Sequence, residues 1–180
     1  MTRTRLVLLT LLLAVIGQVV ACDSKSGDGG ATGEEAPVAT TAAPQFDKPP
    51  DTTVSAGGRT VQMGIGTYCW TNMCVDKIGP ITRASLMVSR GDRVVVAIPS
   101  GTTSLKDVNV TAFPAGASQD LGNGETAWQP LFDRSSELPS TRSAGAIEFA
   151  ADLAAGSYVL SVGMFFDRGD VQYGVVLEVR

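Results

Sequence analysis

The residues that could do chemistry in this sequence are three cysteines and 18 Asp and Glu residues spread along the chain, because the chain contains no histidine. Histidine is the usual general base near neutral pH and the commonest metal ligand, so its absence excludes histidine-dependent catalytic triads and zinc sites. The sequence also has no Gly-x-Ser-x-Gly elbow, no phosphate-binding loop and no pair of carboxylates whose separation can be argued. We therefore expect no catalytic residue, no cofactor and a protein that is not an enzyme.

One group of oxygen-bearing side chains, Asp120, Asn123 and Glu125, could offer ligands to calcium. Calcium loops place their ligands at alternating positions, and these residues miss that spacing. We expect no metal site, with calcium binding here as the alternative.

Two Arg-Gly-Asp triplets, at 90–92 and 168–170, match the triplet that cell-adhesion ligands present to integrins. Each triplet lies between two apolar stretches, where tight turns favour Gly and Asp for conformational reasons. We therefore interpret both triplets as turns, and adhesion is the alternative.

The first 21 residues have the layout of a secretory signal, with Arg3 and Arg5 before an almost uncharged apolar run. The run ends at residues 19–22, Val-Val-Ala-Cys, which resemble the lipobox of bacterial lipoproteins. The resemblance implies cleavage before Cys22, a diacylglyceryl group on its thiol and a further acyl chain on the new amino terminus. Two or more chains hold a protein stably on a membrane, whereas one holds it marginally. The alternatives are an ordinary secretory signal and an uncleaved span, although the run is shorter than the roughly 20 residues that a span needs.

The same resemblance places the protein on the extracytoplasmic face of the cell membrane, with the membrane as its partner through the lipid on Cys22. Removing Arg3 and Arg5 leaves 12 basic against 18 acidic residues, so the net charge falls from −4 to −6. That charge argues against nucleic acid as a partner, because phosphate backbones bind basic surfaces.

If lipid occupies Cys22, then Cys69 and Cys74 remain as an even pair in an oxidising compartment, and we predict a disulfide between them. Closing so short a loop contributes roughly 2 kcal/mol on the chain-entropy model. The alternative is a redox-active dithiol. Against it, the spacing is Cys-x4-Cys rather than Cys-x-x-Cys, and no flanking helix is expected that would lower a thiol pKa.

The composition divides the chain into three parts: a signal peptide at 1–21, a lipidated cysteine with a flexible linker at 22–52, and a β-sandwich domain at 53–180. The linker is rich in Ser, Gly, Ala, Thr, Glu and Pro and holds too few apolar residues to offset its ordering entropy. A flexible chain of that length spans roughly 30 Å, which would hold a domain clear of the lipid head groups.

From residue 53 onward, short apolar alternations broken by Gly, Asp and Pro predict an all-β sandwich or barrel without helices. We expect Cys69 to point inward and Tyr68 and Trp70 to lie on the opposite face of the first strand. Residues 114–141 have few periodic apolar positions and are predicted to form a long connection, with a short piece around 128–132 packing on the sandwich. The expected strands are 59–70, 75–78, 85–88, 93–98, 105–113, 146–153, 158–166 and 171–179.

Residues 153–158, Leu-Ala-Ala-Gly-Ser-Tyr, followed by Leu160 and Val162, resemble the start of the penultimate strand in fibronectin-III and immunoglobulin-like domains. The resemblance implies an immunoglobulin-like antiparallel β-sandwich of seven or eight strands, in which the Tyr158 hydroxyl bonds back to upstream backbone. It covers the C-terminal third, and Cys69 and Cys74 are too close in sequence to be the familiar bridge between sheets. The pattern Tyr-Cys-Trp at 68–70 with Cys-x-Asp at 74–76 also resembles bacterial lipoproteins and implies no activity.

The hairpin around the predicted disulfide is the candidate binding surface, because a pinned tip with aromatic side chains has already lost the entropy that binding usually costs. In the alternative, Tyr68 and Trp70 pack on the 114–141 connection and Asp76 caps a turn. The candidate surface residues are Tyr68, Trp70, Asn72, Met73, Asp76 and Lys77.

We therefore expect a lipid-anchored, extracytoplasmic binding or interaction module of the bacterial cell envelope, with a protein or glycan partner in the envelope. One alternative is a hydrolase or sugar-processing enzyme of the envelope, and another is a structural accessory subunit of a membrane complex. Converging carboxylates in a cleft would favour the enzyme, and an exposed aromatic patch would favour binding.

Overall fold

The computed structural model describes residues 48–180 apart from 101 and 103, and these residues belong to one unit, Ala42–Arg180. The predicted signal peptide, the lipidation of Cys22 and nearly all of the predicted linker lie outside the described residues. Within them the chain forms fifteen strands, one short 3-10 turn and no α-helix, so the all-β prediction is confirmed.

The first sheet contains five strands in the order β12-β13-β7-β1-β2. The alternation of Val94 and Val96 in β7, and of Ile147 and Phe149 in β13, buries one face of this sheet. The strands are β1 (Thr53–Ala56), β2 (Arg59–Gln62), β7 (Arg93–Ala97), β12 (Ser140–Ser143) and β13 (Ala146–Ala150).

The second sheet runs in the order β11-β8-β14-β15-β3-β4, and β6 pairs in parallel with the C-terminal part of β15. Its centre is the long hairpin of β14 and β15, which pair along their whole length and turn at Asp167 and Arg168. The strands are β3 (Gly64–Trp70), β4 (Met73–Val75), β6 (Ser85–Val88), β8 (Leu105–Pro114), β11 (Ser136–Glu137), β14 (Gly156–Phe166) and β15 (Gly169–Val179).

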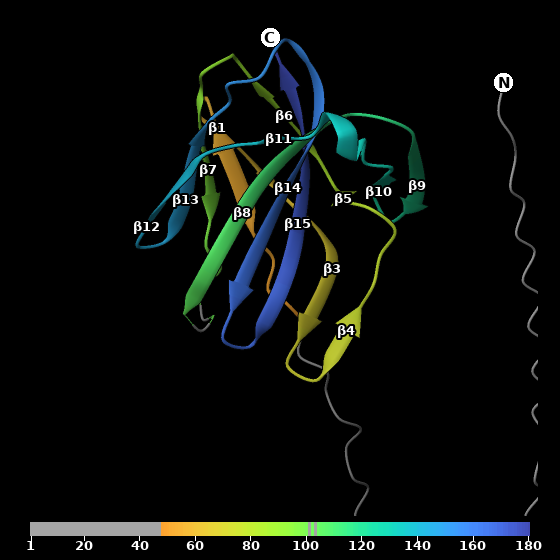
Figure 1. The fold of residues 1–180 in the computed structure, drawn as a ribbon, viewed down its shortest axis with the longest axis vertical. Coiled ribbons are helices and arrows are strands. Elements are labelled where there is room, and N and C mark those ends of the chain that lie inside the picture. Colours follow the sequence, from red (N-terminus) through yellow and green to blue (C-terminus); the bar gives the residue numbers. More distant parts are fainter. Residues whose placement is uncertain (1–47, 101, 103) are drawn as a thin grey trace, which may run out of the picture. The chain divides into compact units, whose positions relative to one another are not determined.

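The two sheets enclose one apolar core and form an antiparallel sandwich (Figure 1). The order β12-β13-β7-β1 in one sheet and β8-β14-β15 in the other matches the two-sheet strand arrangement of immunoglobulin-like sandwiches. The core side chains include Val54, Val94, Val96, Ile147, Phe149, Val110, Ala112, Leu160, Val162, Met164, Tyr173, Val175 and Leu177.

The strand count exceeds the expected seven or eight mainly because residues 114–141 are not a plain connection. They contain β9 (Ser118–Gly122), β10 (Glu125–Trp128), the 3-10 turn η1 (Phe132–Arg134), β11 and the start of β12. In addition, the predicted strand 59–70 is interrupted at Met63, so it forms β2 and β3.

A third sheet, β5-β10-β9, lies at one side of the sandwich, on the right in Figure 1. Its first strand, β5 (Ile81–Thr82), crosses the outer face of β3 and β15 at the paired glycines Gly64 and Gly174. A Cβ atom on Gly64 would lie 2.5 Å from the Ile81 carbonyl oxygen, and one on Gly174 would also clash with that oxygen. The two glycines therefore allow β5 to approach the sandwich.

The predicted faces of the first long strand are wrong, because β3 contains a bulge. Tyr173 pairs with Ile65 and Val171 pairs with Tyr68, so two residues of β3 lie opposite the single residue Gln172. An extra residue reverses the alternation that follows it. Tyr68 and Trp70 consequently point into the core, while Cys69 is only partly buried.

The corner bond implied for Tyr158 is also absent among the described residues, where its hydroxyl makes no hydrogen bond. Tyr173 makes a comparable bond instead: its buried hydroxyl donates to the Pro50 carbonyl oxygen at 2.7 Å. Burial raises the pKa of this phenol far above its ordinary value of 10.0, and the nearby Asp51 carboxylate adds to the effect. Tyr173 thus ties the start of the domain to the centre of the second sheet.

Candidate functional site

The predicted disulfide between Cys69 and Cys74 is present and joins β3 to β4. Thr71 and Asn72 form the turn between these strands, and Thr71 has a positive φ of 54°. The Thr71 amide donates to the Arg168 carbonyl oxygen at 2.8 Å. The disulfide hairpin is therefore attached to the neighbouring β14–β15 turn.

The candidate surface on this hairpin is wrong for its two aromatic members. Tyr68 is 8% exposed and Trp70 is 3% exposed, and both belong to the sandwich core. Trp70 packs edge-on against Phe166, with ring centroids 5.6 Å apart, and the Arg168 guanidinium lies over its ring. Because of the β3 bulge, neither aromatic side chain can act as an exposed anchor.

The remaining members of that set divide between the surface and internal contacts. Asn72 and Asp76 are exposed, while Met73 and Lys77 are partly buried. The Thr67 hydroxyl contacts the Asp76 carboxylate at 3.2 Å and accepts from the Lys77 amide at 3.1 Å. Asp76 and Lys77 therefore help to hold the chain that leaves β4.

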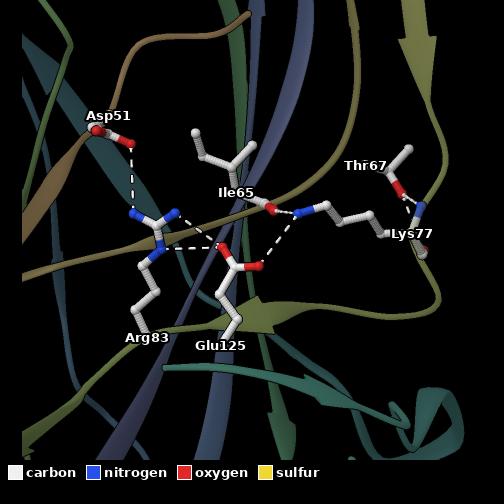
Figure 2. A network of polar contacts seen from close by, with 6 residues as sticks. All are labelled: Asp51, Ile65, Thr67, Lys77, Arg83 and Glu125. Atoms are coloured by element: carbon white, nitrogen blue, oxygen red, sulfur yellow. Dashed lines mark hydrogen bonds and ion pairs between the residues drawn. The ribbon is translucent and has the colours of Figure 1, made fainter. Parts of the chain in front are cut away.

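A network of polar contacts connects this chain to the third sheet (Figure 2). The Lys77 ammonium donates to the Ile65 carbonyl oxygen at 2.8 Å and lies 3.8 Å from the Glu125 carboxylate. Glu125 also accepts from the Arg83 guanidinium at 3.1 and 3.0 Å, and Arg83 lies 3.9 Å from Asp51. The network fixes β10 relative to β3 and to the segment before β1.

The same network explains why the calcium alternative gains no support. Glu125 is paired with two cations, and the Asp120 carboxylate accepts from the Gly122 amide at 2.8 Å within β9. No group of three or more metal-ligating side chains occurs among the residues that the structure describes.

A groove of about 380 Å³ opens beside this network, over the third sheet. Sequence reasoning missed this groove, because its walls are brought together by residues about fifty positions apart. The local signal was Trp128, a large aromatic residue in the stretch 114–141 that was expected to be a connection. The groove is lined by Ile78, Ala117, Ser118, Gln119, Ala127, Trp128 and Gln129.

Trp128 is held in the groove by both its backbone and its side chain. Its backbone amide donates to the Pro80 carbonyl oxygen at 3.0 Å, and its indole Nε1 donates to the Thr82 hydroxyl at 2.9 Å. Gly79, with a φ of 74°, has no room for a Cβ atom against the Trp128 carbonyl oxygen. A close turn and a buried hydroxyl therefore fix the indole in position.

Ile78 projects from the same turn and is 91% exposed. An aliphatic side chain in that position gains nothing from folding, because its apolar surface stays in contact with water. Its place on the rim of a groove that contains a fixed indole is an arrangement typical of a binding site.

Another groove of about 340 Å³ lies elsewhere on the domain and has a different chemistry. Its lining includes the charged residues Arg59, Glu178 and Arg180, and it contains no aromatic side chain. The exposed Met87 on β6 also borders it. This groove offers a charged surface, in contrast to the uncharged groove over Trp128.

Both charged residues of the first Arg-Gly-Asp triplet make contacts within the domain. Arg90 binds the Asp152 carboxylate at 2.9 Å, and the Asp92 carboxylate accepts from the Ser89 amide at 2.7 Å. The turn interpretation accounts for these contacts.

Within residues 48–180, leaving out 101 and 103, no helix has the length and hydropathy needed to cross a bilayer. Comparison of the chain with protein-family models, curated proteins and solved structures gave no match.

Proposed function

We propose that this chain is a lipid-anchored binding module on the extracytoplasmic face of a bacterial cell envelope, and that the groove over Trp128 is its ligand site. The observation that carries the proposal is the exposed Ile78 at the rim of a groove whose indole is already fixed. A rigid aromatic group binds with little loss of conformational entropy, so such a site is prepared for a ligand.

Two further features support the compartment and the absence of catalysis. A disulfide at Cys69 and Cys74 is typical of proteins that fold outside the cytoplasm. The sequence has no histidine, the lining of the groove contains no carboxylate, and the Glu125 carboxylate on β10 is paired with Lys77 and Arg83. The proposal therefore assigns the groove to binding rather than to acid–base chemistry.

The test is photo-crosslinking in intact cells, with a photoreactive amino acid placed at position 78 of the full-length lipoprotein. The matched control carries the same group at Met87, an exposed apolar position (38%) beside the charged groove. We expect position 78 to capture an envelope component, and we expect this product to be missing from the Met87 control. Equal products from both positions, or no product from position 78, would contradict the proposal.

A further inference from the structure

We propose that the groove over Trp128 binds a neutral saccharide, with the indole as the surface on which a sugar ring stacks. The inference rests on the proposed function and names the ligand class of the same site. It assigns hydrogen bonding with the sugar hydroxyls to Ser118, which pairs with Trp128 and lies on the same face of the sheet, and to Gln119 and Gln129, which line the groove from neighbouring positions.

The dimensions and rigidity of the groove suit a ligand of one or two sugar rings. Its volume of about 380 Å³ falls at the small end of the range for small-molecule sites. The bond from Nε1 to Thr82 uses the polar edge of the indole inside the protein. Trp128 is still partly exposed, so its ring can make apolar contact with a ligand, and the ring does not need to be ordered when a ligand arrives.

The charge of the lining favours an uncharged ligand. All seven residues of the groove are neutral, although the chain as a whole has a net charge of −4. A charged ligand would lose hydration in the groove without gaining a counter-charge from the lining. The groove beside Arg59 and Arg180 shows that the domain has charged surfaces elsewhere.

The polar groups of the lining distinguish a saccharide from an aliphatic ligand. A carboxamide both donates and accepts hydrogen bonds, as a sugar hydroxyl does, and the side chains of Gln119 and Gln129 make no hydrogen bond within the described part of the chain. An aliphatic ligand would cover these groups without replacing their hydrogen bonds to water. A sugar ring presents an apolar C–H face to an indole and hydroxyls at its rim, so it matches both parts of the lining.

The experiment uses the two tryptophans of the sequence as reporters. Trp70 is buried in the core, so a ligand at the surface should change only the signal of Trp128. The full-length lipoprotein, in a detergent without a sugar head group, is titrated with maltotriose, cellotriose and chitotriose. Fluorescence and the two indole N–H resonances are followed, and a Trp128→Phe variant assigns the resonance.

We expect a saturable change at Trp128 with at least one trisaccharide. The double variant Gln119→Ala with Gln129→Ala should weaken this binding by at least about tenfold, because truncation of central contacts typically costs this much. Both side chains are exposed, so this variant should keep the wild-type melting temperature. The control Met87→Ala should bind like the wild type.

No saturable change with any of the three sugars would overturn the inference, as would equal binding by the double variant. If position 78 nevertheless crosslinks to an envelope protein, the proposed binding function is supported and only the saccharide as its ligand is ruled out. If the protein binds a sugar but position 78 captures no envelope component, the envelope role is contradicted and the ligand class is retained.

Discussion

At the scale of single residues, the domain depends on a few side chains that lock one segment onto another. The Tyr173 hydroxyl holds the Pro50 carbonyl oxygen from within the core. Gly64 and Gly174 have no side chain, and this leaves room for β5 to lie against β3 and β15. These residues position the third sheet and the first residues of the domain, and so they indirectly shape the groove.

Tyr173→Phe removes the hydroxyl and leaves the Pro50 carbonyl oxygen without its donor. We expect a loss of about 1 kcal/mol in the free energy of unfolding at neutral pH, the usual value for one hydrogen bond. Because the pKa of Tyr173 is raised in the folded state, its contribution is complete below pH 10 and is lost as the pH rises above that value. Urea unfolding at several pH values should therefore show the two proteins converging in stability above pH 10, and a constant difference would contradict this.

Gly174→Ala places a methyl group against the Ile81 carbonyl oxygen, so β5 must move away from the second sheet. We expect a loss of about 1–3 kcal/mol, the typical cost of overpacking. The control is Gly66→Ala on the neighbouring strand, where a Cβ atom would lie 3.2 Å from the carboxamide oxygen of Gln172 and 3.3 Å from its backbone carbonyl oxygen, a milder contact than at Gly174. If thermal melting gave both variants the same stability, β5 would not be packed as described.

At the scale of elements, the disulfide hairpin strengthens the end of the sandwich instead of displaying aromatic side chains. Its bond closes a short loop, and the turn is also attached to the β14–β15 turn through Thr71. The loss of the bond should therefore lower stability and leave the fold in place.

The double variant Cys69→Ser with Cys74→Ser should lower the free energy of unfolding by about 2 kcal/mol, because the unfolded chain regains the entropy of an open loop. Denaturant unfolding with and without a reducing agent measures this difference. The reducing agent should lower the stability of the wild type and leave the variant unchanged. A wild type insensitive to reduction would show that the bond contributes little.

Elements with regular alternation could be predicted from the sequence, and those that depend on irregular pairing could not. The hairpin expected at 158–166 and 171–179 is β14 and β15, and the strand expected at 85–88 is β6. The β3 bulge reverses the faces of Tyr68 and Trp70, and its signal in the sequence was Gly66, a glycine inside a strand pattern.

The third sheet and its groove were harder to predict for a different reason. The strand β9 is exposed along its whole length, so it lacks the alternation that identifies a half-buried strand. Ile78 and Trp128 line the same groove because residues 79–80 lie against β10, a contact between distant parts of the chain. Local patterns carry no information about such a contact.

At the scale of the whole molecule, the proposed function joins a membrane anchor at Cys22 to a sandwich that offers the uncharged groove over Trp128 to the envelope. The signal and the lipobox resemblance predict an extracytoplasmic compartment, and the disulfide is typical of proteins that fold in such a compartment. A ligand bound in the groove would then be held near the membrane by the linker.

The most direct test of this account is the mass of the N-terminal peptide from protein purified out of membranes. We predict that this peptide begins at Cys22 and carries a diacylglyceryl group, and that the protein partitions with the lipid fraction. A peptide that begins at Met1 with an unmodified Cys22, from protein recovered in the aqueous fraction, would contradict the account.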